Sequence, residues 1–211
     1  MHIVCLDLEG VLIPEIWIEF SRCFGIPDLS ITTRDEPDYD KLMRFRIETL
    51  QQHKLGFPDI LKVIESMNPL PGATSFIDWL SERFQVVILS DTFYQFAQPF
   101  MRKLTWPTLF CHRLEVNVDG RVVNYCLRMP DHKRAAVAAF KALHFHTIAV
   151  GDSYNDTTML KEADVGIFYC PPTNVIAEFP MFPVTRNYHH LRAAIDEEAL
   201  RIVAGVNRNT G

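Results

Sequence analysis

Residues 2–11 read HIVCLDLEGV, an apolar and partly β-branched run that stops at two acids and a glycine. The run predicts a buried β-strand over His2–Leu8. Asp7 and Glu9 lie two residues apart, so strand alternation points both carboxylates to one side, and Gly10 permits a tight exit from the strand. Taken alone, acids at a strand end are equally well explained as acceptors for turn amides.

Two later segments repeat this design. Gln85–Leu89 is apolar and stops at a Ser-Asp pair, and His146–Val150 is apolar and stops at a Gly-Asp pair. Helix-like stretches lie between the strands, at 71–84 and 130–143. Strands that alternate with helices predict an α/β fold with a doubly wound parallel sheet, in which ligands bind beyond the carboxyl ends of the strands.

The segment 14–71 breaks this alternation. Its helical patterns cover 15–23, 39–52 and 58–67. Because this is too much chain for a simple crossover, we expect a helical cap at 14–71, inserted into a catalytic core made of 1–13 and 72–211. Farther along, 109–127 alternates around Asp119-Gly120, which is a strong hairpin signal. We expect a short helix at most in 171–183 and a final amphipathic helix over 189–204.

The composition limits the classes of partner. The chain has 211 residues, of which 48% are hydrophobic and 22% charged, as in an ordinary globular protein. Its net charge of −5 argues against nucleic acid or an anionic membrane as a partner, and its apolar runs are too short to span a bilayer. Five scattered cysteines without a Cys-x-x-Cys pair favour reduced thiols and a cytoplasmic protein. The oligomeric state stays open, with a homodimer as one alternative.

Three more segments add polar groups near the carboxyl ends of the expected strands, where ligands bind in such sheets. Residues 151–156 read GDSYND, which is more than a helix N-cap requires and suits a hard cation bound through oxygen. Ser90-Asp91 is expected to begin a helix, where a hydroxyl beside free amides can hold phosphate, although an N-cap pair explains it equally well. Lys133 near a helix start would offset carboxylate repulsion and bind phosphate oxygens, whereas most such lysines are merely solvated.

Taken in their order along the chain, these segments resemble the four motifs of the haloacid dehalogenase superfamily of phosphatases. DLEGV at 7–11 is similar to the first motif, SDT at 90–92 to the second, Lys133 to the third and GDSYND at 151–156 to the fourth. The resemblance covers nearly the whole chain and is strongest to the phosphoserine phosphatases, in particular to the bacterial type that also transfers phosphate to homoserine. It implies Mg²⁺-dependent hydrolysis of the small molecule phosphoserine, with homoserine as a second acceptor.

The resemblance also implies a role for the acids. Asp7 would be the nucleophile that forms an aspartyl phosphate, and Glu9 the general acid and base. The Mg²⁺ ligands would be Asp7, the backbone carbonyl of Glu9, Asp152, and Asp156 either directly or through water. The family usually has Asp in place of Glu9. The extra methylene moves the carboxyl by roughly one bond length, so either the backbone compensates or water activation weakens and another hydroxyl competes as acceptor.

Substrate contacts follow from the same resemblance. The phosphoryl oxygens would be held by Ser90, the amide of Asp91 and Lys133, with Asn155 orienting the lysine or the phosphate. On the expected cap helix, Arg46 lies on one face with Tyr39, Met43 and Leu50. A buried Arg46 needs an anion, whereas a snorkelling one reaches water; in the family an arginine here binds the substrate carboxylate. Glu15 would bind the substrate ammonium, although the helix dipole alone also favours an acid there.

Two other classes of protein share part of this pattern. A receiver-type signalling domain also phosphorylates an Asp at a strand end beside a hydroxyl and a lysine, but the large cap segment argues against it. A phosphatase of another small phosphomonoester would leave Arg46 and Glu15 unexplained. A zinc site at the His144-x-His146 pair lacks a third ligand with suitable spacing.

Overall fold

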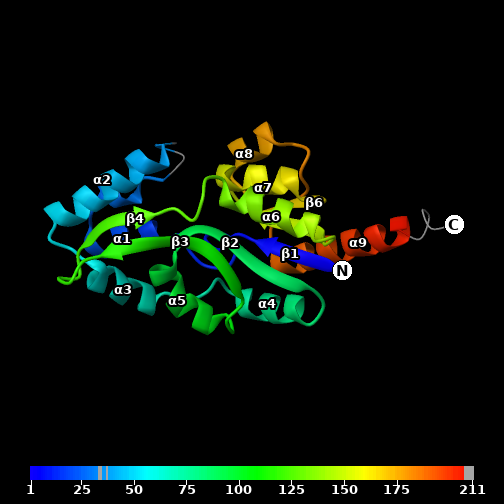
Figure 1. Cartoon of the computed structure of the whole chain (residues 1–211), viewed down its shortest axis with the longest axis horizontal. Helices are drawn as coiled ribbons and strands as arrows, with labels where there is room; N and C mark the ends of the chain where they lie inside the picture. Colours follow the sequence, from blue (N-terminus) through cyan, green and yellow to red (C-terminus); the bar gives the residue numbers. More distant parts are fainter. Residues whose placement is uncertain (33–34, 37, 207–211) are drawn as a thin grey trace.

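The computed structural model describes residues 1–32, 35–36 and 38–206, with side chains described as far as residue 201. The expected cap and core thus include a few residues outside the described ones, namely 33, 34, 37 and 207–211. The described chain forms a seven-stranded sheet in the order β4-β3-β2-β1-β5-β6-β7 (Figure 1). Neighbouring strands are parallel except for β3 and β4. The strands are β1 (His2–Leu6), β2 (Gln85–Phe93), β3 (Thr108–Val116), β4 (Val122–Cys126), β5 (His146–Gly151), β6 (Val165–Tyr169) and β7 (Val184–Thr185).

Alternation along the central strand β1 explains why helices cover both faces of the sheet. Val4 and Leu6 pack into one apolar cluster with α4, α5 and α9, whereas Ile3 and Cys5 pack into a second cluster with α6, α7 and α8. In Figure 1, α6, α7 and α8 lie above the sheet, and α4 and α5 lie below it. These helices are α4 (Ala73–Ser81), α5 (Tyr94–Lys103), α6 (His132–Ala142), α7 (Thr157–Glu162), α8 (Thr173–Glu178) and α9 (Tyr188–Val206). The expected doubly wound α/β fold is confirmed.

The chain between β1 and α4 is helical. It contains α1 (Ile16–Phe24), the 3₁₀ turn η1 (Pro27–Ser30), α2 (Tyr39–Gln52) and α3 (Phe57–Ser66). These helices gather around the β3–β4 hairpin at one end of the molecule (Figure 1). The amide of Phe57 donates to the carbonyl of Gly120 at the hairpin turn (2.8 Å), and the Tyr125 hydroxyl donates to Asp40 on α2 (2.6 Å). The hairpin expected around Asp119-Gly120 is therefore confirmed, and α2 and α3 contact it.

One expected boundary is wrong. The sequence pattern predicted that the second strand ends at Leu89 and that Ser90 begins a helix, but β2 continues to Phe93 and α5 begins at Tyr94. The pairing of β2 with β3 shifts register between Leu89 and Phe93, and beyond the shift Phe93 pairs with His112. Such irregularities re-aim side chains next to ligand sites. Among the described helices, none is long and apolar enough to cross a bilayer.

Candidate active site

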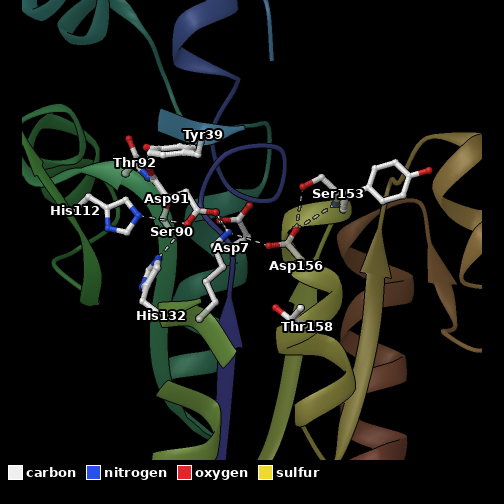
Figure 2. Close-up of polar contacts among 12 residues, drawn as sticks. Asp7, Tyr39, Ser90, Asp91, Thr92, His112, His132, Ser153, Asp156 and Thr158 are labelled. Atoms are coloured by element: carbon white, nitrogen blue, oxygen red, sulfur yellow. Dashed lines mark hydrogen bonds and ion pairs between the residues drawn. The ribbon is translucent and has the colours of Figure 1, made fainter. Parts of the chain in front are cut away.

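The carboxyl ends of three adjacent strands meet at one edge of the sheet (Figure 2). Asp7 directly follows β1, Ser90 and Asp91 belong to β2, and Asp152 directly follows β5. All of the expected site residues except Asp156 line one cleft at this edge. These lining residues are Asp7, Glu9, Glu15, Arg46, Ser90, Asp91, Lys133, Asp152 and Asn155. The sheet topology therefore brings together residues that are far apart in the sequence.

Two glycines allow the acids to approach one another. At Gly10, where φ is +78°, an added Cβ would lie 2.4 Å from Oδ2 of Asp152. At Gly151, an added Cβ would lie 2.3 Å from the Cβ of Asp156. Any larger residue at either position would push a carboxylate out of place. The glycines in the first and fourth sequence motifs thus have a steric reason in this fold.

Lys133, the second residue of α6, is held by carboxylates. Its ammonium donates to Asp7 Oδ1 (2.9 Å) and Asp156 Oδ1 (2.9 Å) and lies 3.2 Å from Asp91 Oδ2. An ammonium has three protons to donate; two go to Asp7 and Asp156, and the third remains for Asp91 or for a ligand in the cleft. Burial alone disfavours the charged form, but the charges of Asp156, Asp7 and Asp91 outweigh it and raise the pKa of Lys133 well above its usual value. Lys133 is therefore a fixed positive charge beside Asp7.

Asp156 is fully buried behind the cleft, and donors from the protein surround it. Its Oδ2 accepts from the amide (3.1 Å) and the hydroxyl (3.3 Å) of Ser153 (Figure 2) and from the amide of Asp152 (2.9 Å). Its Oδ1 accepts from Lys133. These hydrogen bonds hold the turn after β5 and the Lys133 side chain in fixed positions relative to each other. Asp156 thus orders the loop that carries Asp152.

A divalent cation fits the acids of this edge. Asp7, Asp152 and Asp156 each offer a carboxylate oxygen, and these atoms lie within 4.8 Å of one another at buried positions. Burial, followed by the charge of Asp156, raises the pKa of Asp7 well above its usual range, although Lys133 opposes this. The single positive charge of Lys133 does not balance the negative charge of these carboxylates. A hard cation bound through oxygen would, and the donor set has the chemistry that Mg²⁺ prefers.

Ser90 and Asn155 lie at the cleft in different surroundings. Ser90 is buried in β2, and its Oγ accepts weakly from the amide of Thr92 (3.3 Å). Because α5 begins only at Tyr94, the free amides of a helix N-terminus do not lie beside Ser90 as expected. The backbone amides next to Ser90 belong instead to the irregular end of β2. Asn155 is exposed at the rim. The described ion pairs and hydrogen bonds of Lys133 go to carboxylates and not to Asn155.

The side chain of Glu9 joins the end of β1 to α1, the first helix of the chain. Its Oε2 accepts from the amide of Ile16, the first residue of α1, at 2.9 Å. Glu15 itself makes no side-chain cap hydrogen bond, although it occupies the N-cap position. Burial, followed by the charge of Glu15, raises the pKa of Glu9 to about 8. The longer side chain at position 9 therefore caps α1, and the carboxylate of Glu15 lines the cleft.

Arg46 on α2 is buried, so the snorkelling alternative is wrong. Its Nη2 donates to the carbonyl of Ile31 (2.8 Å), and its guanidinium lies 4.6 Å from the ring centroid of Trp17. Burial lowers the pKa of Arg46 to about 10. Among the described residues, no carboxylate forms an ion pair with it. A buried, unpaired cation in a cleft is costly unless a ligand brings an anion.

Comparisons with known proteins agree with this geometry. A family model described as haloacid dehalogenase-like hydrolase matches residues 1–164. The chain belongs to this family of hydrolases. It is 58% identical over 192 residues to phosphoserine phosphatase ThrH of Pseudomonas aeruginosa, a match that covers 91% of this chain and 94% of that protein. It is also 58% identical to a phosphoserine phosphatase of Pseudomonas syringae pv. tomato, over 91% of this chain and 81% of that protein.

The fold of this hydrolase is shared with solved structures. A phospho-aspartyl intermediate analogue of a phosphoserine phosphatase has a TM-score of 0.75 at 21% identity, over 92% of this chain and 98% of that chain. A substrate-bound phosphoserine phosphatase complex has a TM-score of 0.73 at 20% identity, over 92% and 97%. These structures confirm the α/β fold, and the family model together with the 58% identity confirms the superfamily expected from the motifs.

Sequence reasoning missed one group at the edge of this site. His112 on β3 and His132 at the start of α6 both contact the side chain of Asp91 (Figure 2). Asp91 thus contributes more than the backbone amide expected of it. The two histidines stand twenty residues apart in the sequence, in elements of different type. Nothing local in the sequence marks them as partners; only the pairing of β2 with β3 and the packing of α6 bring them together.

Proposed function

We propose that this hydrolase is a Mg²⁺-dependent phosphoserine phosphatase that forms an aspartyl phosphate on Asp7 and also transfers phosphate to homoserine. The observation that carries the proposal is the buried guanidinium of Arg46, which lines the same cleft as Asp7 and Lys133. A carboxylate nucleophile beside a fixed ammonium suits phosphoryl transfer, and a buried arginine suits a substrate carboxylate. The 58% identity to two Pseudomonas phosphoserine phosphatases supports the same substrate.

In this mechanism an oxygen of Asp7 attacks the phosphorus. The new bond to Asp7 forms as the bond between phosphorus and the seryl oxygen breaks, and Glu9 gives its proton to the leaving oxygen. Water then attacks the phosphorus, gives a proton to Glu9 and releases phosphate from Asp7. When the hydroxyl of homoserine takes the place of water, the product is phosphohomoserine. The non-bridging oxygens would be held by Ser90, the amide of Asp91 and Lys133, with Asn155 at the rim.

The properties of Glu9 support both halves of this cycle. A carboxyl whose pKa is raised to about 8 can donate a proton in the first step and accept one in the second near neutral pH. One of its oxygens is tied to the amide of Ile16, which draws the carboxyl toward α1. We infer that this placement activates water less well than a shorter Asp would, so that homoserine competes as acceptor.

The cation and the inserted helices complete the proposal. Mg²⁺ would be held by Asp7, the backbone carbonyl of Glu9 and Asp152, and it would neutralise charge where nucleophile and phosphate meet. Because the oxygens of Asp156 already accept protein donors, we infer that Asp156 acts on the cation through water.

We infer further that 14–71 is a cap over a core made of 1–13 and 72–211. The Tyr39 hydroxyl on α2 donates to the carbonyl of Asp91 on β2 (3.0 Å), which supports a direct link between cap and core. In this cap, Arg46 would bind the substrate carboxylate and Glu15 the substrate ammonium. The five cysteines are free thiols, which supports a cytoplasmic location for the enzyme.

The experiment is a turnover assay of the purified chain with phosphoserine and Mg²⁺, with and without homoserine. Serine, phosphate and phosphohomoserine are measured together. We expect serine in both reactions, with phosphohomoserine formed at the expense of phosphate when homoserine is present. The Asp7→Asn variant should form none of these products. A wild-type chain that releases no serine, but hydrolyses another phosphomonoester, would contradict the assigned substrate.

A further inference from the structure

Asp91 is held between two buried imidazoles and the active-site lysine. His132 Nε2 lies 3.2 Å and His112 Nε2 lies 3.5 Å from Oδ1 of Asp91, whereas Lys133 lies 3.2 Å from Oδ2. Both histidine side chains are 3% exposed, and their rings meet edge to face with centroids 4.6 Å apart. Figure 2 shows the two rings converging on one side of Asp91.

The backbone fixes where the ring protons of these histidines lie. The amide of Arg128 donates to Nδ1 of His112 at 3.1 Å, so that Nδ1 is an acceptor and the proton of the neutral ring lies on Nε2, facing Asp91. Nδ1 of His132 is buried without a hydrogen-bond partner among the described residues, and burial lowers the pKa of this ring. A neutral His132 therefore places its proton on Nε2 as well, where the carboxylate accepts it.

This proton arrangement argues against a metal centre at the three residues. Asp91, His112 and His132 have ligand atoms within 4.8 Å of one another, as a metal site would require. A metal-bound imidazole, however, needs a lone pair on the nitrogen that faces the metal, and it donates a proton from the other nitrogen. In His112 the other nitrogen accepts from the amide of Arg128, so this ring presents an N–H group to Asp91 and not a lone pair to a metal.

The consequence is a carboxylate with a fixed charge and a fixed orientation. Burial alone would raise the pKa of Asp91, but the charge of Lys133 and the hydrogen bonds from His112 and His132 lower it well below its usual value. The Asp91 side chain is 31% exposed and lines the cleft. A carboxylate free to turn there would repel a phosphoryl group. The two N–H groups hold it on the side of Lys133 instead.

We propose that His112 and His132 are positioning residues, which fix Asp91 so that Asp91 in turn fixes the Lys133 ammonium against Asp7. Asp156 holds Lys133 from the other side (2.9 Å). Lys133 is thus braced by two carboxylates that do not react, each of which is itself ordered by protein N–H groups. The kinetic part of this inference rests on the proposed phosphatase activity.

The test compares His→Leu with His→Gln at positions 112 and 132 in the full chain. Leucine removes the donor, whereas the glutamine amide can place an N–H near the position of Nε2. We expect His132→Leu and His112→Leu each to lower kcat for phosphoserine about tenfold, the equivalent of one hydrogen bond to a charged group. KM should change less than about twofold, and the Gln variants should recover most of kcat. His189→Leu, at an exposed histidine on α9, is the matched control.

A double-mutant cycle separates positioning through Asp91 from a merely structural role. In an Asp91→Ala background, which removes the acceptor of the His132 N–H, His132→Leu should cost almost nothing further, because its effect passes through the carboxylate. A full additive loss in that background, or Leu variants with unchanged kcat, would overturn the proposal.

Nitrogen–proton correlation spectra of the wild-type imidazoles test the same arrangement without turnover. The expected result is a proton on Nε2 of both rings. A proton on Nδ1 of His112, or zinc bound in place of the Nε2 proton, would overturn the proposal even if the Leu variants failed to fold. Should the wild type not hydrolyse phosphoserine, the proposed function fails, while these spectra still decide the network.

Discussion

Replacing Arg46 with methionine tests how the enzyme selects its substrate. The guanidinium is buried, stacks on Trp17 and has no ion-pair partner among the described residues. Methionine keeps most of the volume but removes the charge. Since the buried charge is unpaired without substrate, its removal should leave the free energy of unfolding unchanged or slightly raised. The variant therefore isolates binding from folding.

The expected magnitude follows from the contacts that would be lost. Nη2 already donates to the carbonyl of Ile31, which leaves the rest of the fork for the substrate carboxylate. One or two charge-assisted hydrogen bonds at about 1.5–3 kcal/mol each correspond to a loss of roughly 100-fold in kcat/KM, at a factor of ten for about 1.4 kcal/mol. Most of this loss should be a higher KM, because the carboxylate lies away from the reacting phosphorus.

The assay compares two substrates that differ in one group. Phosphoserine carries the carboxylate and phosphoethanolamine lacks it, so Arg46→Met should lower kcat/KM for the first and leave the second nearly unchanged. Arg44→Met is the matched control, because Arg44 lies on the same helix but is exposed and pairs with Asp40 (2.6 Å). Equal losses for both substrates, or no loss for phosphoserine, would refute the assignment of Arg46 to the substrate carboxylate.

Three further changes probe other parts of the site. Glu9→Asp should raise the ratio of phosphate to phosphohomoserine in the assay with homoserine, and an unchanged ratio would speak against the role of the longer side chain. Removal of divalent cations with EDTA should stop turnover, and added Mg²⁺ should restore it; full activity in EDTA would exclude a required cation. Gly10→Ala, whose Cβ would lie 2.4 Å from Oδ2 of Asp152, should lower kcat/KM at least ~tenfold because it displaces a carboxylate. Gly25→Ala, where nothing lies within 4 Å of the added Cβ, should cost only about 1 kcal/mol of stability for the left-handed backbone and keep activity, as denaturation and turnover will show.

The parts of the fold that the sequence predicts are those with a local cause. β1 is apolar at consecutive positions, so its side chains point alternately to the two faces, Val4 and Leu6 to one helical layer and Ile3 and Cys5 to the other. Such a continuous apolar run predicts a sheet covered on both faces. The order of the motifs predicts which residues meet at the strand ends. The first feature depends on neighbours in the sequence, and the second on motifs that are each recognisable from a short stretch of sequence.

The parts that the sequence does not predict depend on tertiary contacts. The extension of β2 to Phe93 follows from a register shift against β3, which leaves no local signal around Ser90. Glu9 caps α1 by accepting from the amide of Ile16, and this contact forms only because the chain reverses direction after Gly10. The imidazoles around Asp91 come from β3 and α6 and meet only in the folded chain. Secondary-structure propensity and motif spacing do not predict such tertiary contacts.

Trapping of the phosphorylated enzyme tests the central claim most directly. The wild-type chain is mixed with phosphoserine and Mg²⁺, quenched in acid within the first turnover and digested, and its peptides are analysed by mass spectrometry. The mechanism predicts a phosphate on the peptide that contains Asp7, which disappears when the reaction runs to completion and never forms in Asp7→Asn. Rapid release of serine with no phosphopeptide at any time, or a phosphate on another residue, would contradict Asp7 as the nucleophile.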